Sequence, residues 1–143
     1  MISYRYAEEK DVVDILALDD NNFSNNYDEK FYLDYIKNKR VIVAIDNKVV
    51  GYIIFNMIFD ETEIYKIVVS EYYRKKQIAY KLMEFFIEEL KKCDVKKIFL
   101  EVRKSNIPAI NLYKKCNFVE IREIFDYYDN PKENGIMMLK EVV

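Results

Sequence analysis

Residues 63–90 read EIYKIVVSEYYRKKQIAYKLMEFFIEEL, and this stretch decides the fold. Its β-branched, apolar beginning at residues 64–69 predicts a buried strand, and apolar residues at helical spacing predict a helix over residues 78–92. A short basic turn, residues 74–79 (RKKQIA), joins the two. A helix N-terminus presents unpaired backbone N–H groups and the positive end of the helix dipole, so it can hold an anion. We expect a phosphate-bearing ligand at this turn; the alternative is a merely solvated basic turn.

Upstream of this stretch, the sequence predicts a short strand, two helices and an antiparallel meander. The strand covers residues 2–6 and the first helix residues 7–20, while polar residues 21–27 indicate a loop. Asp28 is a good N-cap for the second helix. Strands follow at 41–45, 49–57 and 62–69, with turns at 46–47 and 60–61. Gly51 inside the second of these strands indicates a bulge or a close backbone approach.

Downstream, residues 95–102 predict a strand parallel to 63–69, provided that the helix between them is a right-handed crossover. Asn106, with Ser105, caps a short helix with Pro108 in its first turn, which ends near Asn117. Strands at 118–125 and 136–142 follow, joined by a hairpin through residues 129–131. The order βααβββαβαββ predicts an α/β (α+β) fold: one domain, residues 1–143, with a mixed sheet of about seven strands and helices on both faces.

Two scarce residue types exclude whole classes of site. The chain has no histidine, which excludes Ser-His-Asp and Cys-His catalysis and metal sites with histidine ligands. A general base must then be a carboxylate, a tyrosine, a lysine, a cysteine or a water. The chain has only two glycines, Gly51 and Gly135, so a glycine-rich phosphate loop of the usual kind is excluded.

Charge and hydropathy point to no nucleic acid and no membrane. The net charge is −2, which gives no global electrostatic reason to bind nucleic acid. No apolar run approaches the ~18 residues that a membrane span needs, and the N-terminus does not read as a signal peptide. The two cysteines, Cys93 and Cys116, are expected to be packing residues in a reducing compartment. We therefore expect a cytoplasmic protein.

Two blocks of the sequence resemble the GNAT acyltransferases. Residues 68–79 are similar to motif A of that family, a strand followed by R/Q-x-x-G-x-G/A and a helix. The second block resembles the LEVRxSN…AIxLYxxxGF pattern of the RimI-like branch, whose members acetylate the N-terminal amine of a ribosomal protein. The tyrosine pair at 127–128 also matches. The matching residues of the second block are Leu100, Glu101, Val102, Arg103, Ser105, Asn106, Ala109, Ile110, Leu112, Tyr113 and Phe118.

The resemblance implies a GNAT fold in which two central parallel strands splay apart and acetyl-CoA lies between them. It implies no metal. It assigns the general base to Glu101, the general acid to Tyr113 and a cofactor contact to Asn106. The remaining implied cofactor-binding residues lie at the end of the strand and in the basic turn: Ile67, Val68, Val69, Arg74, Lys75, Lys76, Gln77, Ile78, Ala79 and Tyr80.

Without the resemblance, each of these residues has a structural role that explains it equally well. Glu101 can be a solvated or salt-bridged strand residue, Tyr113 is one of thirteen tyrosines, and Asn106 is a helix cap. The chemistry nevertheless agrees with the implied roles. A carboxylate can deprotonate an α-amine with a pKa near 7.7–8.0, and a tyrosine can protonate a thiolate whose pKa is near 8.5.

The chain departs from the family pattern at four places. Gln77 replaces a glycine and keeps its N–H available if its φ stays negative, and Asn117 replaces the glycine before Phe118. Residues 133–135 (ENG) replace the family's E-D-A, and residues 23–27 lack a tryptophan-containing turn. The last two places shape the acceptor site, so the acceptor is less firmly implied than the cofactor.

Three functions therefore remain open. The first is acetyl-CoA-dependent acetylation of a protein or peptide N-terminus, with a ribosomal protein as one possible acceptor. The second keeps the chemistry but uses a small amine, such as a polyamine or an amino sugar. The third is an acyl-CoA-binding module with little turnover, which Gln77 suggests. The chain can act as a monomer or a homodimer under each of them.

Overall fold

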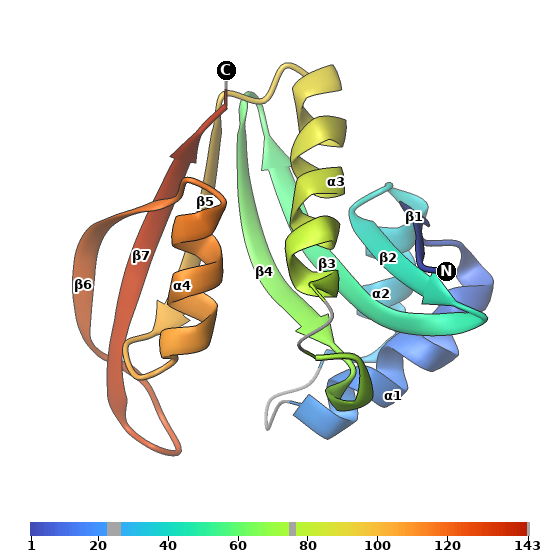
Figure 1. The fold of residues 1–143 in the computed structure, drawn as a ribbon, viewed down its shortest axis with the longest axis horizontal. Coiled ribbons are helices and arrows are strands. Elements are labelled where there is room, and N and C mark those ends of the chain that lie inside the picture. The colour runs from blue at the N-terminus through green and yellow to red at the C-terminus, as the bar shows by residue number, and fades with distance from the viewer. Residues whose placement is uncertain (23–26, 75–76, 143) are drawn as a thin grey trace. The chain divides into compact units, whose positions relative to one another are not determined.

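Strands and helices follow one another in the predicted order in the computed structural model, which describes residues 1–22, 27–74 and 77–142. Two short 3-10 helices, η1 and η2, are added to that order. The elements, labelled in Figure 1 apart from η1 and η2, are β1 (Ser3–Tyr6), η1 (Glu9–Asp11), α1 (Val12–Asn22), α2 (Glu29–Lys37), β2 (Val41–Asp46), β3 (Lys48–Ile58), β4 (Glu61–Val69), η2 (Glu71–Tyr73), α3 (Ile78–Lys92), β5 (Lys97–Arg103), α4 (Ile107–Lys115), β6 (Val119–Tyr128) and β7 (Glu133–Glu141).

The sheet is mixed and has seven strands in the order β1-β2-β3-β4-β5-β7-β6. The expected fold class is confirmed. β4 is the middle strand, and it pairs in parallel with β5 over Glu61–Glu63 against Lys97–Phe99, as the crossover rule predicts. The predicted divergence of these two strands beyond that pairing stays a prediction. No helix in the described ranges is both long enough and apolar enough to span a bilayer.

The chain divides into two compact units, residues 1–55 with 66–86, and residues 56–65 with 87–143. The first unit contains most of the meander. There, α1 and α2 lie on one face of β2 and β3, and the first half of α3 lies on the other (Figure 1). The fully buried rings of Phe55 and Phe86 meet edge to face with centroids 4.9 Å apart, which anchors α3 on β3. The single-domain organisation of residues 1–143 stays a prediction.

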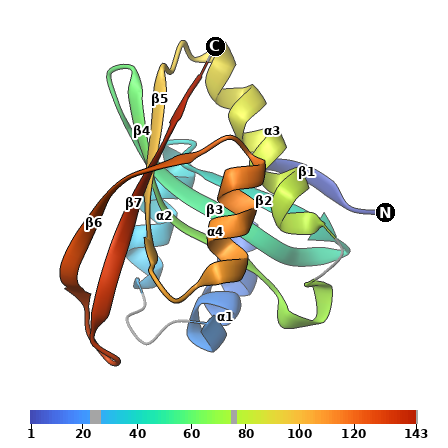
Figure 2. The ribbon, with the colours of Figure 1, turned by 60° about the vertical axis from the view of Figure 1, so that its left-hand side comes forward.

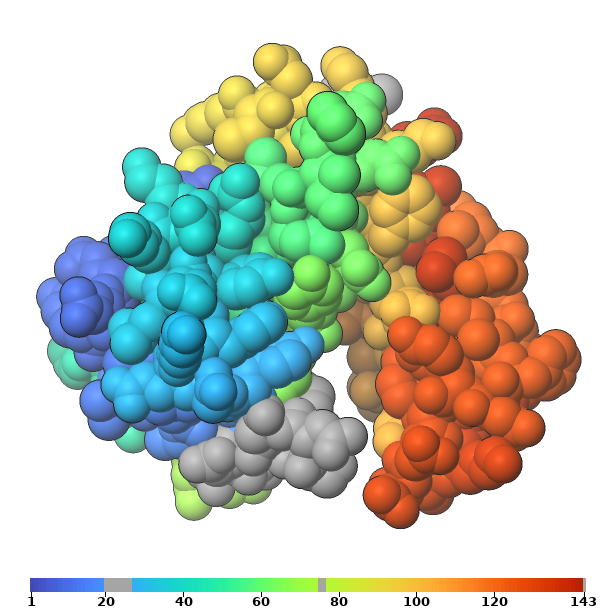
Figure 3. All heavy atoms as spheres, turned by 180° about the vertical axis from the view of Figure 1, so that it is seen from behind, coloured from blue at the N-terminus to red at the C-terminus, as the bar shows by residue number. Residues whose placement is uncertain are grey.

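The second unit is built on β5, β7 and β6, with α4 as its helix. β6 and β7 form a long antiparallel hairpin and run side by side (Figures 1 and 2). β6 is the edge strand of the sheet, and together with the turn that follows it forms part of the surface of this unit (orange to red in Figure 3). Buried Tyr113 of α4 and buried Phe118 lie with ring centroids 6.0 Å apart, so the end of α4 is fixed in this unit's core.

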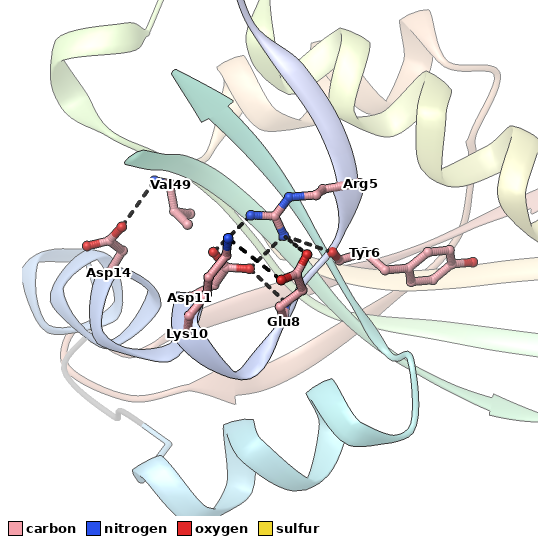
Figure 4. Close-up of polar contacts among 7 residues, drawn as sticks. All are labelled: Arg5, Tyr6, Glu8, Lys10, Asp11, Asp14 and Val49. Carbon is pink, nitrogen blue, oxygen red and sulfur yellow. Dashed lines mark hydrogen bonds and ion pairs between the residues drawn. The ribbon is translucent and has the colours of Figure 1, made fainter. Parts of the chain in front are cut away.

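The N-terminal helix begins later than predicted. Residues 7–20 were expected to be helical, but Glu8 is extended and a 3-10 turn precedes α1 (Figure 4). A capping box explains this, because the Glu8 backbone N–H donates to Asp11 Oδ2 at 2.7 Å and the Glu8 side chain accepts from the Asp11 backbone. Asp11 is also held by Arg5 at 2.7 Å, and Asp14 accepts from the Val49 N–H at 3.2 Å. These local bonds outweigh the helical periodicity of the sequence.

Most other boundaries agree with the sequence. α3 covers the predicted residues 78–92, Asp28 accepts from the Phe31 N–H at 2.8 Å as an N-cap, and Asn117 has the predicted positive φ, 70°. The loop predicted at residues 21–27 is wrong at its start, since α1 continues to Asn22, and residues 23–26 lie outside the described ranges.

Candidate active site

The end of β4 in the first unit carries the backbone predicted to bind the cofactor arm, Ile67–Val69. Gly51 of β3 allows a close approach here, because a Cβ built on it would lie 3.0 Å from the Val68 carbonyl oxygen. The sequence predicted such an approach, and the register of β2 against β3 also shifts at Ala44 and Ile45. Just past the strand, the Ser70 N–H donates to the Val50 carbonyl at 2.8 Å. β3 therefore fixes the path of the backbone as it leaves the sheet.

A buried ion pair holds β4 just before that segment. Lys66 Nζ lies 2.5 Å from Oδ1 of Asp19, and both side chains are almost fully buried. Asp19 also accepts a hydrogen bond from the Tyr52 hydroxyl at 3.3 Å, and Tyr52 is hydrogen-bonded to Tyr32 at 2.8 Å. Burial raises the pKa of Tyr52, so its hydroxyl remains protonated and available as a donor. A buried charge without its partner is costly, so this network ties α1 to β4.

Gln77, which stands where the family has a glycine, adopts a backbone conformation that glycine takes up readily. Its φ is +60°, in the left-handed region, so the condition under which the sequence predicted an available N–H, a negative φ, is not met. Its carbonyl accepts from the Lys81 N–H at 3.0 Å, which places Gln77 directly before the first turn of α3. The turn thus keeps a glycine-like backbone although the side chain is larger. The cost of this conformation in a residue with a Cβ is about 1–2 kcal/mol.

The other predicted cofactor residues around Gln77 differ in their surroundings. Arg74 is exposed, and its Nε donates to the Val69 carbonyl at 3.3 Å. Ile78 is buried, whereas Ala79 and Tyr80 are half-buried at the start of α3. Ile78 can therefore contribute to an anion site only through its backbone. Lys75 and Lys76, also predicted here, lie outside the described residues.

In the second unit, Glu101 lies on β5, opposite Met137 of β7, and is half-buried. Its Oε1 accepts a hydrogen bond from the Tyr127 hydroxyl at 2.8 Å. Burial, and then this hydrogen bond to an anion, raise the pKa of Tyr127 to about 12. Tyr127 therefore stays a donor at neutral pH, which fixes one oxygen of the carboxylate and leaves the other for a different partner.

Tyr128 follows Tyr127 and interacts electrostatically with both Glu101 and Tyr113. Burial and the charge of Glu101 raise the pKa of Tyr128 to about 12. The two adjacent rings are in edge contact at 5.0 Å. Gly135 makes room for both, since a Cβ there would lie 3.0 Å from Tyr127 Cδ2 and 3.2 Å from Tyr128 Cε2. Gly135 is one of the three residues, 133–135, at which the chain departs from the family pattern. Because it has no side chain, the tyrosine pair can pack on β7.

Arg103 holds the hairpin that carries the tyrosine pair. Its guanidinium donates to the carbonyls of Asp129 and Pro131 at 2.9 Å each, and to Glu133 Oε1 at 3.2 Å. It also lies 4.5 Å from the centre of the Tyr128 ring. β5 therefore supplies the candidate base, Glu101, and also Arg103, whose side chain holds the hairpin that carries the tyrosine pair.

Tyr113, the predicted general acid, is on α4 and is buried. Burial first, and then the neighbouring Tyr128, raise the pKa of its hydroxyl. Within the described part of the chain, no hydrogen bond to another residue engages that hydroxyl. Its proton is therefore retained at neutral pH and is free to be donated to a bound substrate.

Asn106 is the N-cap of α4, where its side chain accepts from the Ala109 N–H at 3.3 Å. The predicted cap is thus confirmed, while the cofactor contact stays a prediction. Cys116 is buried, in accord with a packing role, whereas Cys93 is exposed, so the packing role expected for Cys93 is wrong; the two cysteines are not joined in a disulfide.

One acidic residue beside Glu101 was missed from the sequence. Glu63 of β4 is half-buried in the same unit, and its carboxyl is close enough to Glu101 for a side-chain hydrogen bond. Burial, then the charge of Glu101, raise the pKa of Glu63. The sequence shows a glutamate on each of two strands that are predicted to be parallel. It does not show the register of those strands, which decides that the two glutamates lie close together.

Comparisons with known proteins agree with the fold. A profile described as the acetyltransferase (GNAT) family matches residues 10–118. An N-alpha-acetyltransferase of Saccharolobus solfataricus is 30% identical, over 93% of this chain and 89% of its own. The ribosomal protein bS18-alanine N-acetyltransferase of Escherichia coli is 30% identical, over 83% of this chain and 77% of its own. The crystal structure of the ribosomal-protein-S18-alanine N-acetyltransferase from Escherichia coli superposes with a TM-score of 0.89 at 26% identity, covering 99% of this chain and 94% of that one.

Proposed function

This chain belongs to the acetyltransferase (GNAT) family, and from that premise we propose that it transfers the acetyl group of acetyl-CoA to the N-terminal α-amine of a protein or peptide. The observation that carries the acceptor class is the agreement between two groups of relatives. One group is named for N-alpha-acetylation and the other for acetylation of the alanine of a ribosomal protein, and both align with more than four fifths of this chain. Neither name refers to a small amine.

Glu101 acts as the general base in this proposal. A protein α-amine has a pKa near 7.7–8.0, so much of it arrives as the ammonium form at neutral pH. The N–H bond breaks, an O–H bond forms on the Glu101 carboxylate, and the nitrogen lone pair becomes free to attack the thioester carbon. Tyr127 supports this role because its hydrogen bond occupies one carboxylate oxygen and orients the other.

Tyr113 acts as the general acid. As the new C–N bond forms, the C–S bond breaks and its electron pair goes to sulfur, a thiolate whose pKa resembles the ~8.5 of cysteine. Tyr113 donates its proton to that sulfur. The nitrogen's remaining extra proton leaves to water as the amide forms, and water restores the proton of Tyr113. The raised pKa of Tyr113 supports this role, since the hydroxyl is protonated over the whole working pH range.

The first unit holds acetyl-CoA mainly through backbone groups. We assign the pantetheine arm to Ile67–Val69 and the pyrophosphate to the turn from Arg74 to Ala79. Tyr80, and Asn106 of the second unit, are further proposed contacts. Lys75 and Lys76 are part of this proposal from the sequence alone. The left-handed Gln77 supports the assignment, because it preserves the backbone path of a glycine at this position. Cys93 and Cys116 form no disulfide with each other, which fits a reducing compartment, and we place the activity in the cytoplasm.

Intact-mass measurement of peptides tests this function. The protein is incubated with acetyl-CoA and one peptide at a time. The peptides begin with different residues, and one of them copies a ribosomal-protein N-terminus. We expect a single added acetyl group that disappears when the peptide N-terminus is blocked beforehand. Turnover with polyamines or amino sugars but with no peptide would refute the proposed acceptor. Cofactor binding without turnover on any acceptor would refute catalysis and favour a binding module.

A further inference from the structure

The carboxyl groups of Glu63 and Glu101 form a pair on neighbouring strands. In the parallel register, Glu63 lies opposite Phe99, and Glu101 is two residues further along β5 and therefore on the same face. The two side chains come within hydrogen-bonding reach of each other. Because two carboxyl groups can share a hydrogen bond only when one carries a proton, this arrangement is built to hold a proton.

The hydrogen bonds described around the pair come from neutral groups. On the β3 side, the Glu63 backbone N–H donates to Asn56 Oδ1 at 2.9 Å, and the Asn56 amide donates to the Tyr65 hydroxyl at 3.0 Å. On the β6 side, the Tyr127 hydroxyl donates to Glu101, and Tyr128 lies within the field of Glu101. Arg103, next on the same face of β5, is engaged by Glu133 and the hairpin carbonyls.

We propose that Glu63 is a positioning residue that acts through Glu101: the two carboxyl groups work as one proton-sharing pair, and Glu63 receives, in a hydrogen bond, the proton that Glu101 removes from the acceptor ammonium. This inference rests on the proposed function, since it concerns the base of that reaction. The negative charges of the two carboxylates repel each other, which favours the binding of one proton by the pair, and a Glu63 oxygen then shares that proton in a hydrogen bond.

The proton balance is closed without another reactant. One proton leaves the ammonium nitrogen and binds Glu101, so the charge of the pair changes from −2 to −1. That proton then lies between the two carboxyl groups and passes to water when the product leaves. Two carboxylates this close repel each other. The pair therefore binds its first proton at a higher pH than one isolated carboxylate does. The raised pKa of Glu63 is in accord with this coupling.

The pH profile of kcat/KM for an acetylated peptide tests the pair. Glu63→Gln removes one charge and keeps the shape of the side chain. We expect its acid limb to move to lower pH by about one unit and its plateau rate to fall by roughly 3- to 10-fold, because a weaker base removes the proton less well. Glu63→Asp retains the charge and keeps the acid limb closer to that of the wild type than to that of Glu63→Gln.

Glu61→Gln is the matched control. Glu61 is two residues earlier on the same face of β4, is exposed, and lies opposite Lys97. We expect it to leave the acid limb and the rate unchanged. An unmoved limb and an unchanged rate in Glu63→Gln would overturn the inference. A shift of equal size in Glu61→Gln would also overturn it, because general charge and not the pair would then be responsible.

Two measurements read the pair without turnover and so separate it from the proposed function. Carboxyl carbon-13 titration of the free enzyme is expected to show the Glu63 resonance titrating at lower pH in Glu101→Gln, because the charge of Glu101 helps to raise the pKa of Glu63; an unchanged Glu63 titration refutes the pair even if peptides are acetylated by the wild type. The second is thermal stability. Folding raises the pKa of Glu63, so the stability it contributes is present below the ordinary pKa of 4.5 and is lost as pH rises through the folded value. Glu63→Gln should therefore have a higher Tm than the wild type at neutral pH, with the gain shrinking toward acid pH, and a Tm difference that does not change with pH would contradict the coupling.

Discussion

The two groups of proposed functional residues, one in each unit, use the chain in opposite ways. In the first unit, the segment from Ile67 to Tyr80 offers mainly backbone: a strand end whose path Gly51 permits, and a left-handed residue before α3. In the second unit, the working parts are side chains: Glu101 held by Tyr127, Glu63 beside it, and Tyr113 on α4. A site made of backbone depends on conformation, whereas a site made of side chains depends on chemical identity.

This difference explains which departures from the family pattern the fold tolerates. Gln77 replaces a glycine, yet its φ of +60° lies in the region that glycine adopts readily. In the second unit, the replaced segment at residues 133–135 has been rebuilt around specific contacts, such as Arg103 with Glu133 and Gly135 with the two tyrosines. Substitutions in the second unit should therefore change the rate, and substitutions in the first should change cofactor affinity.

Glu101→Gln gives the largest effect. It removes the base and keeps the side-chain size, so we expect kcat/KM for the peptide to fall by at least about 10²-fold, with the greatest loss at lower pH, where more of the amine is protonated. Steady-state rates between acid and neutral pH measure this. Glu120→Gln, an exposed glutamate on β6, is the control and should retain the wild-type rate. If Glu101→Gln instead raised KM for acetyl-CoA severalfold and left kcat unchanged, the assignment of proton transfer to the second unit and of cofactor binding to the first would be wrong.

Tyr113→Phe is next. It removes one hydroxyl from a buried ring and leaves the packing against Phe118 in place, so kcat should fall by about 10²-fold while Tm changes little. Single-turnover rates and thermal melting measure the two quantities. Tyr4→Phe on β1 serves as the control. It removes a buried hydroxyl that has no hydrogen-bond partner among the described residues, and it should leave turnover unaltered. Wild-type kcat in Tyr113→Phe would assign the proton donor to another group.

The two glycines permit a direct comparison of the units, because an added Cβ at either would have a closest contact of 3.0 Å. At Gly51 that contact is the Val68 backbone oxygen, so Gly51→Ala must displace β4; we expect a loss of about 1–3 kcal/mol and a severalfold higher KM for acetyl-CoA. At Gly135 the contact is the Tyr127 ring, so Gly135→Ala should instead raise KM for the peptide. Denaturant unfolding and KM for both substrates measure this, and identical KM changes in the two variants would remove the distinction.

The sequence predicted the fold well where local patterns agree with tertiary packing. α3 was predicted to the residue because its apolar stripe, Ile78 to Leu90, is also its buried face. The start of α1 was missed because a capping box involving Glu8 and Asp11 competes with the helical period. Such side-chain bonds depend on three-dimensional placement, here strengthened by Arg5, which no periodicity reveals.

The candidate site shows the same limit. Glu101 and Tyr113 could be assigned because the resemblance covers their motif, and Asn106 because a cap precedes a proline-containing first turn. Glu63 could not, since its importance comes from the register of β4 against β5 and from the proximity of two carboxyl groups. The φ of Gln77 could not be predicted either, because residue type alone favours a negative value.

Gln77 gives the smallest expected effect and the sharpest test of a backbone site. Gln77→Gly relieves the left-handed strain but enlarges the conformational freedom of the unfolded chain, so the two terms largely cancel and stability should change by less than about 1 kcal/mol. Gln77→Val keeps a side chain but is β-branched, which disfavours positive φ, and should destabilise by roughly 1–2 kcal/mol. If the backbone path is what binds the pyrophosphate, Gln77→Gly should keep or lower KM for acetyl-CoA, and Gln77→Val should raise it. A KM that rises equally in both variants would mean that the glutamine side chain itself contacts the cofactor, and the contrast between a backbone half and a side-chain half would no longer hold.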